Sequence, residues 1–228
     1  MVMVLISIYD NATAEVGVSM LSIFAQGFFL QASLVLALGA QNIFVLNSGL
    51  RKQRHLFVAT ICSICDAILI FIGVLGVATF FIQFPLLKIL LGIVGVGFLF
   101  FYGGMKLKEA KDGAEFSPTS VKAVSIKKTV LTTLGFTLLN PHVYLDTFVL
   151  IGGYSSKFNA VIERFYFGAG ASALSVIWFF GLSLLASFAS RLLSNAKAMR
   201  GVSLVSGLIL IFLAVKLGSD VLGWIREA

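Results

Sequence analysis

The sequence predicts an all-α integral membrane protein. Its 228 residues are 59% hydrophobic and only 12% charged, and the mean hydropathy of +1.02 lies far above that of an ordinary soluble domain. Six apolar runs are each long enough to cross a hydrocarbon core of about 30 Å. One long polar segment, 106–128, divides these runs into two groups of three. We therefore expect six transmembrane helices arranged as two three-helix repeats.

The predicted spans are 21–46, 56–82, 86–105, 129–153, 165–188 and 199–217. Residues 21–105 would form the first repeat, 106–128 a cytoplasmic linker, and 129–228 the second repeat. Because three spans carry a chain to the opposite side of the membrane, two related repeats must be inverted. Residues 1–20 begin with an apolar stretch that lacks the basic residues of a signal peptide. We interpret them as a short tail, with Met20 as an alternative start.

Basic residues predict the orientation. The net charge is +7, but the lysines and arginines lie between apolar runs rather than on one continuous face, which argues against a nucleic-acid partner. Most of them fall in the first, third and fifth loops, and cytoplasmic loops are typically enriched in such residues. We therefore expect these loops in the cytoplasm and both termini outside. The residues are Arg51, Lys52, Arg54, Lys106, Lys108, Lys111, Lys122, Lys127, Lys128, Arg191, Lys197 and Arg200.

Two spans contain signals for a broken helix. Pro141 lies inside the fourth span, where it removes a backbone donor and crowds the preceding turn. The segment 138–146 aligns weakly with 38–46, where Gly39 precedes two polar residues, and each segment then continues with an aliphatic, aromatic, aliphatic run. Interrupted spans at corresponding positions of two inverted halves are a sequence signature of a transporter's binding site. We expect helix breaks at Gly39 and Pro141, near the middle of the membrane.

Asp66 and Asp146 are the only acidic residues well inside the predicted spans. A charged side chain at the centre of a membrane helix costs roughly 2.5 to 3.5 kcal/mol or more, so it requires a compensating role. One role is structural, an interhelical hydrogen bond from a protonated aspartate worth about 0.6 to 2 kcal/mol. The other is functional, as a receptor for a cation or as a proton carrier. We favour the functional role, more strongly for Asp146, which lies beside the break.

Several short motifs are typical of one bacterial membrane family. They are Gly39-Ala40-Gln41-Asn42, Gly49-Leu50-Arg51-Lys52, Cys65-Asp66, Leu139-Asn140-Pro141-His142-Val143-Tyr144-Leu145-Asp146-Thr147, Trp178-Phe179-Phe180-Gly181-Leu182 and Ala196-Lys197-Ala198-Met199-Arg200. On these residues the chain resembles the lysine/arginine exporter (LysE) family, closest to its arginine-exporter branch. Ala40 departs from the proline usual in that family, which leaves Gly39 to supply local flexibility. The resemblance implies a secondary exporter of basic amino acids in the bacterial inner membrane.

A basic amino acid carries two cationic groups and one carboxylate, so its site needs acceptors and donors together. Asp66 and Asp146 would take the cationic groups, and helices that restart after the two breaks would aim free N–H groups at the carboxylate. Orienting hydrogen bonds would come from polar side chains near the breaks. Substrate-binding residues are therefore expected to be Asp66, Asp146, Gln41, Asn42, Asn140 and Tyr144.

Proton coupling would balance the electrical cost of export. Moving one cation outward costs about 2.3 kcal/mol per 100 mV of negative-inside potential, and one inward proton would cancel that cost. Asp66, Asp146 and His142 are the candidate proton relay. A histidine in this setting is equally often a simple hydrogen-bonding partner. We expect alternating access to a midplane site, with protons as the coupling ion and arginine or lysine as substrate.

Three alternatives are compatible with the sequence. An exporter of another small amino acid or cation would share the fold. An intramembrane aspartyl protease would also use two membrane carboxylates, although Asp66 lacks flanking glycines and no other hydrolase motif is present. A structural membrane protein would have no need of the carboxylates.

The remaining polar features suggest no cofactor and no metal. Cys62 and Cys65 have no second ligand pair and are interpreted as packing residues. Lys216 and Asp220 are spaced as an i, i+4 pair near the end of the last span, which we interpret as a boundary pair with a snorkelling lysine. Small residues within the spans favour close helix packing and are compatible with a homodimer.

Overall fold

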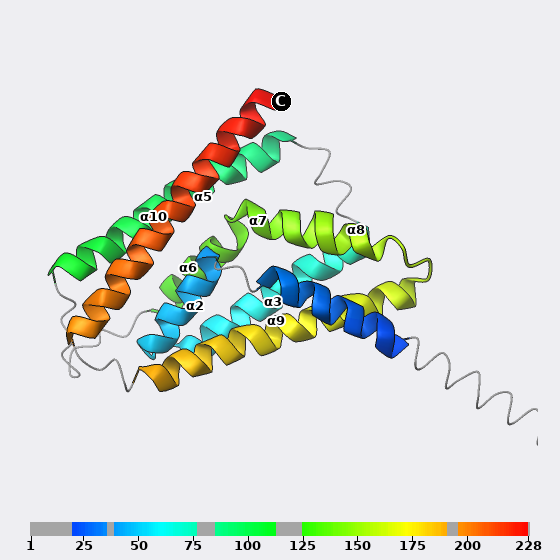
Figure 1. Ribbon diagram of the computed structural model, residues 1–228, viewed down its shortest axis with the longest axis horizontal. Helices are drawn as coiled ribbons and strands as arrows, with labels where there is room; N and C mark the ends of the chain where they lie inside the picture. Colours follow the sequence, from blue (N-terminus) through cyan, green and yellow to red (C-terminus); the bar gives the residue numbers. More distant parts are fainter. Residues whose placement is uncertain (1–19, 36–38, 77–84, 113–124, 191–195, 228) are drawn as a thin grey trace, which may run out of the picture.

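The computed structural model describes residues 20–35, 39–76, 85–112, 125–190 and 196–227, and over these residues the chain forms helices without any strand (Figure 1). The predicted tail up to residue 19 and most of the predicted linker lie outside the described residues. The helices are Met20–Val35, α2 (Ala40–Leu50), α3 (His55–Val74), α5 (Pro85–Asp112), α6 (Ile126–Leu138), α7 (Pro141–Tyr144), the π-helix η1 (Leu145–Ile151), α8 (Gly152–Ser155), α9 (Val161–Ala189) and α10 (Ala196–Glu227).

Among the described residues, four helices are long and apolar enough to cross a membrane: His55–Val74, Ile89–Asp112, Val161–Ala189 and Lys197–Arg226. Met20–Val35 and Ala40–Leu50 together give a fifth candidate, bent by 83°. Large apolar side chains are exposed on these helices, including Phe101 and Leu185 at 68% and 70% exposure. Such exposure is stable only in contact with lipid or another protein. The chain is therefore an all-helical, multi-pass membrane protein, which confirms the predicted class.

The fourth predicted span, 129–153, differs most from a simple helix. It consists of α6, a two-residue interruption at Leu139 and Asn140, and then the short helical segments α7, η1 and α8. None of these segments is long enough to cross a membrane alone. Pro141 begins α7, a position where its missing N–H costs no helical hydrogen bond.

Helix α5 continues through Asp112, into the segment expected to be a linker. Residues 106–111 alternate lysines with leucine, glutamate and alanine, all good helix formers. Glu109 also forms ion pairs with Lys106 and with Arg51 of the turn after α2. Local propensity and this pairing extend the helix beyond its apolar run.

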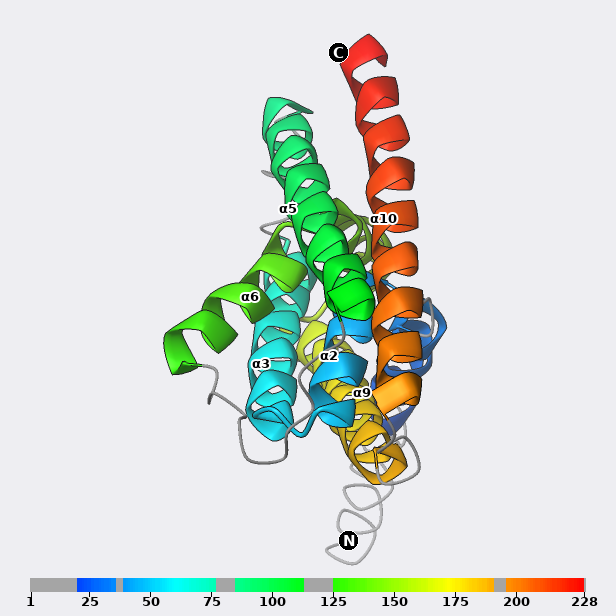
Figure 2. The same cartoon turned by 90° about the vertical axis from the view of Figure 1, so that its left-hand side faces the viewer.

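Helices α5 and α10 lie side by side along most of their length in both views (Figures 1 and 2). Gly103 and Gly207 face each other where they cross, since a Cβ on Gly207 would lie 3.1 Å from the carbonyl oxygen of Gly103. On the other side of the molecule, Met20–Val35 crosses α9 through Gly27 and Gly170. A Cβ on either glycine would collide with a backbone carbonyl of the opposite helix. Small residues thus allow the helix backbones to approach closely.

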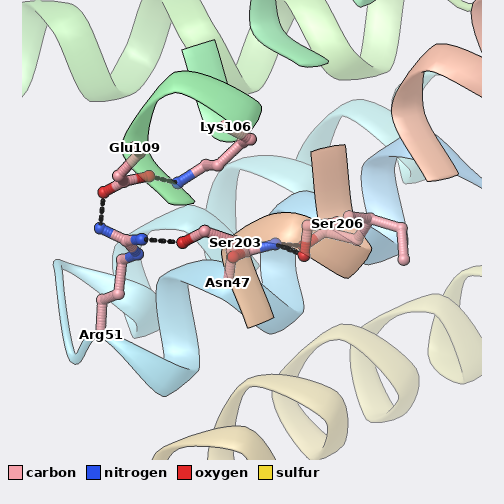
Figure 3. A network of polar contacts seen from close by, with 7 residues as sticks. Asn47, Arg51, Lys106, Glu109, Ser203 and Ser206 are labelled. Atoms are coloured by element: carbon pink, nitrogen blue, oxygen red, sulfur yellow. Dashed lines mark hydrogen bonds and ion pairs between the residues drawn. The ribbon is translucent and has the colours of Figure 1, made fainter. Parts of the chain in front are cut away.

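One end of the molecule collects the basic helix ends. The end of α2, the start of α3, the end of α9 and the start of α10 lie together in the lower half of Figure 2. Arg51 pairs with Glu109 of α5 and donates to Ser203 Oγ of α10 at 2.9 Å (Figure 3). Asn47 Nδ2 donates to Ser206 Oγ at 2.8 Å. These contacts, hereafter the basic-end network, join α2, α5 and α10.

We predict that Gly170→Ala destabilises the protein, whereas Gly181→Ala on the same helix does not. The new methyl group of Gly170→Ala meets the carbonyl of Phe24, and such overpacking typically costs about 1 to 3 kcal/mol. Nothing lies within 4 Å of the Cβ position of Gly181, so alanine there gains about 0.5 to 1 kcal/mol of helix propensity. Melting temperatures in detergent should move in opposite directions. Equal shifts would contradict the close crossing.

Candidate functional site

A cavity of about 310 Å³ lies where the helix breaks meet the centres of the long helices. Its wall is built from segments of seven regions: the end of Met20–Val35, the start of α2, the middle of α3, α5 and α9, the second half of α10, and the interrupted segment from Asn140 through α7 into η1. The volume is at the lower end of the range for small-molecule sites, about 300 to 1,000 Å³. It is therefore large enough for a small solute.

Most of the residues expected to bind substrate line this one cavity. Its wall contains Gly39 and five of the six side chains expected to bind substrate. They come from the two interrupted segments, about a hundred positions apart in sequence, and from α3. Those lining residues are Gln41, Asn42, Asp66, Asn140 and Asp146. The structure thus brings both carboxylates and both interrupted segments to the same place.

Three of the expected residues do not contribute a described side chain to the wall. Tyr144 does not line the cavity, and its hydroxyl donates to the carbonyl of Leu138 at 2.7 Å. This bond spans the interruption, so Tyr144 holds the two sides of the break together. The side chains of Pro141 and His142 lie outside the described part of the structure.

The first break leaves a helix N-terminus at the cavity. Gly39 is extended, with φ −84° and ψ 167°, and α2 begins at Ala40 with no side-chain cap. The first backbone N–H groups of a helix lack intrahelical acceptors and carry partial positive charge. Because Gly39, Ala40 and Gln41 all line the cavity, this helix end favours an anionic group there.

Asn42 holds the two arms of the first break. Its Nδ2 donates to the carbonyl of Val35 at 2.9 Å, which links α2 to the end of the preceding helix. Its Oδ1 accepts a hydrogen bond of 3.1 Å from Trp178 Nε1 on α9. Asn42 therefore has a positioning role as well as a place on the cavity wall.

Asp66 is the most deeply buried charged group of the site, with 5% exposure. Its Oδ2 accepts hydrogen bonds from Ser175 Oγ at 2.8 Å and from Gln31 Nε2 at 3.4 Å. Gln31 also donates to Ser175 Oγ at 2.8 Å. Asp66 lies on α3, Ser175 on α9 and Gln31 on Met20–Val35. Donors on two neighbouring helices therefore hold the Asp66 carboxylate in place.

Asp146 lies in the π-helix η1, is partly buried, and is close enough to Asp66 for the two charges to interact. π-Helical turns are rare and frequently occur at functional sites. Two carboxylates that share one cavity repel each other when both are ionised, and a cation between them relieves that repulsion. The arrangement can therefore accept a cationic group, or a proton in its absence.

Lys216 and Gln31 were not among the residues expected at the site, yet both line the cavity. Gln31 could have been found by the rule that singled out Asp66, since it is polar and well inside the first predicted span. For Lys216 the sequence indicates a membrane boundary, because the apolar run ends beside it. In the structure α10 continues to Glu227, and Leu213 and Leu217 line the cavity on the same part of the helix.

No group of histidine, cysteine and acidic side chains within the described ranges is arranged to hold a metal ion. Cys62 is buried in the apolar cluster around α2, and Cys65 is partly buried. Both are free thiols.

The family follows from comparison with known proteins. The model of the LysE type translocator family matches residues 32–221. The chain belongs to this family. This match confirms the family resemblance that the motifs predict. The chain is therefore a transporter rather than an enzyme, which excludes the protease alternative.

The chain is 40% identical to the arginine exporter protein ArgO of Enterobacter sp. (strain 638) and to that of Escherichia coli (strain K12), over 88% of this chain and 95% of each relative. The ArgO protein of Klebsiella pneumoniae (strain 342) is 39% identical over 90% of this chain and 98% of its own length. No solved structure matches the chain.

We predict that Ser175→Ala lowers the melting temperature of the purified protein, whereas Ser172→Ala does not. Removal of the Ser175 hydroxyl takes a donor from buried Asp66, a loss that typically costs about 1 to 3 kcal/mol. The Ser172 hydroxyl is also buried on α9 but finds no partner among the described residues, so its loss should be neutral or stabilising. Thermal unfolding in detergent measures both. Equal melting temperatures for the two variants would show that the Ser175 bond does not support Asp66.

Proposed function

We propose that this LysE type translocator exports basic L-amino acids, arginine and also lysine, by proton-coupled alternating access. The observation that carries the proposal is the shared cavity, where Asp66 and Asp146 meet the uncapped N-terminus of α2. The curated relatives named arginine exporters support the choice of substrate.

The chemistry of the cavity suits each part of such a substrate. Asp66 and Asp146 would accept hydrogen bonds from the side-chain cation and the α-ammonium, and charge-assisted bonds of this kind are about twice as strong as neutral ones. Gln41, Asn42 and Asn140 would orient the substrate through their amides. A neutral amino acid would leave one carboxylate unpaired in a buried site, which opposes its binding. Export of another small amino acid or cation is the second candidate.

The transport fold that we propose has six spans in two inverted three-helix repeats. The first broken span would be Met20–Val35 with α2, and the second would be α6 with α7, η1 and α8. In support, α2 begins at Ala40 and α7 begins at Pro141. The internal sequence match aligns Ala40 with Asn140, so the two helices begin within one residue of equivalent positions. Both interruptions border the cavity. This is the arrangement expected when two inverted repeats share a midplane site.

We propose that the protein lies in a bacterial inner membrane with its basic end on the cytoplasmic side. Cytoplasmic loops near the membrane carry an excess of lysine and arginine, and the basic-end network links three helices whose ends carry such residues. The odd loops are then cytoplasmic and both termini lie outside. The lipid bilayer covers the exposed apolar side chains, and a homodimer remains a prediction from the small residues alone.

The cavity lies on the outer side of the packed centre in this orientation. Along α2, Phe44 separates the cavity residue Asn42 from Asn47 of the basic-end network. Along α5, Tyr102 separates the cavity residue Leu99 from Lys106. Both rings pack against Phe136 of α6. We infer that this aromatic cluster and the basic-end network close the cytoplasmic path, so that the structure corresponds to an outward-facing state.

Proton coupling would use the same carboxylates. When the cationic substrate leaves to the outside, the repulsion between Asp66 and Asp146 favours uptake of a proton by the pair. Return of the loaded carrier would bring that proton inward and offset the electrical cost of export, about 2.3 kcal/mol per 100 mV. His142 is the third candidate for the relay.

We predict that Asp146→Asn lowers arginine efflux at least about tenfold, equivalent to about 1.4 kcal/mol of lost binding. The amide keeps the shape of the side chain but removes the charge that pairs with the substrate cation. Efflux of radiolabelled arginine from loaded proteoliposomes measures the effect. Asp112→Asn, at the exposed end of α5, is the matched control and should export normally. Normal efflux by correctly folded Asp146→Asn protein would refute this role.

A further inference from the structure

Lys216 is the one basic residue among the described residues that line the cavity. Its side chain is exposed, whereas its neighbour Leu217 on the same wall is 2% exposed. Because Lys216 both lines the cavity and reaches the surface, it lies where the cavity opens. At about 1.5 Å per helical residue, it is roughly 24 Å along α10 from Arg200 at the basic end.

A boundary role does not explain this position fully. A lysine near a span end can extend its ammonium toward water, and that behaviour needs no cavity. However, α10 continues for about three more turns after Lys216, at ~3.6 residues per turn. Neither ion pair within the described residues involves Lys216. The ammonium is therefore available to a ligand at the mouth of the cavity.

The charges of the cavity mirror those of a basic amino acid. The wall carries two carboxylates, Asp66 and Asp146, and one ammonium, that of Lys216. Arginine and lysine carry two cationic groups and one carboxylate. With both aspartates used for the cationic groups, the substrate carboxylate still needs a cationic partner, because a buried unpaired charge is costly.

Two further donors belong to the same wall. Gln41 is 6% exposed and lines the cavity. Its Nε2 donates to no oxygen or nitrogen acceptor among the described residues, although it lies beside the Cys62 thiol. The uncapped first turn of α2 adds backbone N–H groups beside it. Helices α2 and α10, which carry these donors and Lys216, pack against each other and are joined by the bond from Asn47 to Ser206.

We propose that the Lys216 ammonium binds the α-carboxylate of the exported amino acid, and that Gln41 and the N-terminus of α2 complete this carboxylate subsite. The proposal rests on the proposed function and adds a specificity determinant to it. The carboxylate subsite makes the transporter select amino acids over the corresponding amines. It also places the charged backbone of the substrate toward the opening and its side chain toward Asp66.

The test compares arginine with agmatine, which has the same guanidinium and chain but no carboxylate. Binding of each ligand to purified protein in detergent is measured by competition with radiolabelled arginine. We expect wild-type protein to bind arginine at least tenfold more tightly than agmatine. In Lys216→Met, arginine affinity should fall about tenfold, about 1.4 kcal/mol, while agmatine affinity stays the same or rises. For Lys216→Met, agmatine binding is followed directly with radiolabelled agmatine.

Two variants serve as controls. Lys216→Arg keeps a cation at the mouth of the cavity and should retain the preference for arginine, which also provides a folded comparison if Lys216→Met is unstable. Lys108→Met removes an exposed lysine of α5 that does not line the cavity, and its affinities should equal those of the wild type.

The outcomes separate this proposal from the function on which it rests. If wild-type protein binds neither ligand, the proposed function fails. If wild-type protein prefers arginine and Lys216→Met keeps that preference, Lys216 only snorkels and the subsite is refuted. An equal loss of affinity for both ligands in Lys216→Met would assign Lys216 a structural role and would also refute it.

Discussion

The burial of the Asp66 carboxylate inside an apolar helical protein is the constraint on which the rest of the structure depends. A buried carboxylate needs donors, and Ser175 and Gln31 supply them from two neighbouring helices. Those donors require α3, α9 and Met20–Val35 to approach closely, which the glycines at their crossings permit. The same packing brings Asp146 within electrostatic range. Both carboxylates line one cavity, which is the geometry that our proposed cation site requires.

In the proposed site, the helix breaks would allow this anionic centre to bind a zwitterion. An unbroken first helix would bury its backbone N–H groups in helical hydrogen bonds, whereas the break at Gly39 leaves those of α2 facing the cavity. Asn42 and Trp178 hold that bend, and the hydroxyl of Tyr144 spans the second break. Irregular backbone in a membrane protein is tolerated where it lines a cavity. The breaks are thus located where their exposed backbone groups can serve substrate binding.

Sequence patterns predict the membrane class, the family and the polar residues of the cavity wall around the two breaks. These features depend on local signals: a long apolar run, a proline, or a carboxylate inside a span. The position of Lys216 could not be read in this way, because only the packing of α10 decides whether a residue near a span end reaches the cavity. Tyr144 lies in the motif but away from the wall, since the turn after Pro141 directs it to Leu138. The length of α5 depended on ion pairs between distant segments.

We propose that the paired carboxylates select cationic amino acids for export. Efflux of radiolabelled arginine measures this selection in proteoliposomes loaded with arginine alone, arginine plus lysine, or arginine plus citrulline, a neutral analogue of arginine. A pH gradient, acid outside, is applied in half of the samples. We expect lysine to compete with arginine, citrulline not to compete, and outside acid to accelerate efflux. Equal competition by citrulline would contradict charge selection, and efflux indifferent to the gradient would contradict proton coupling.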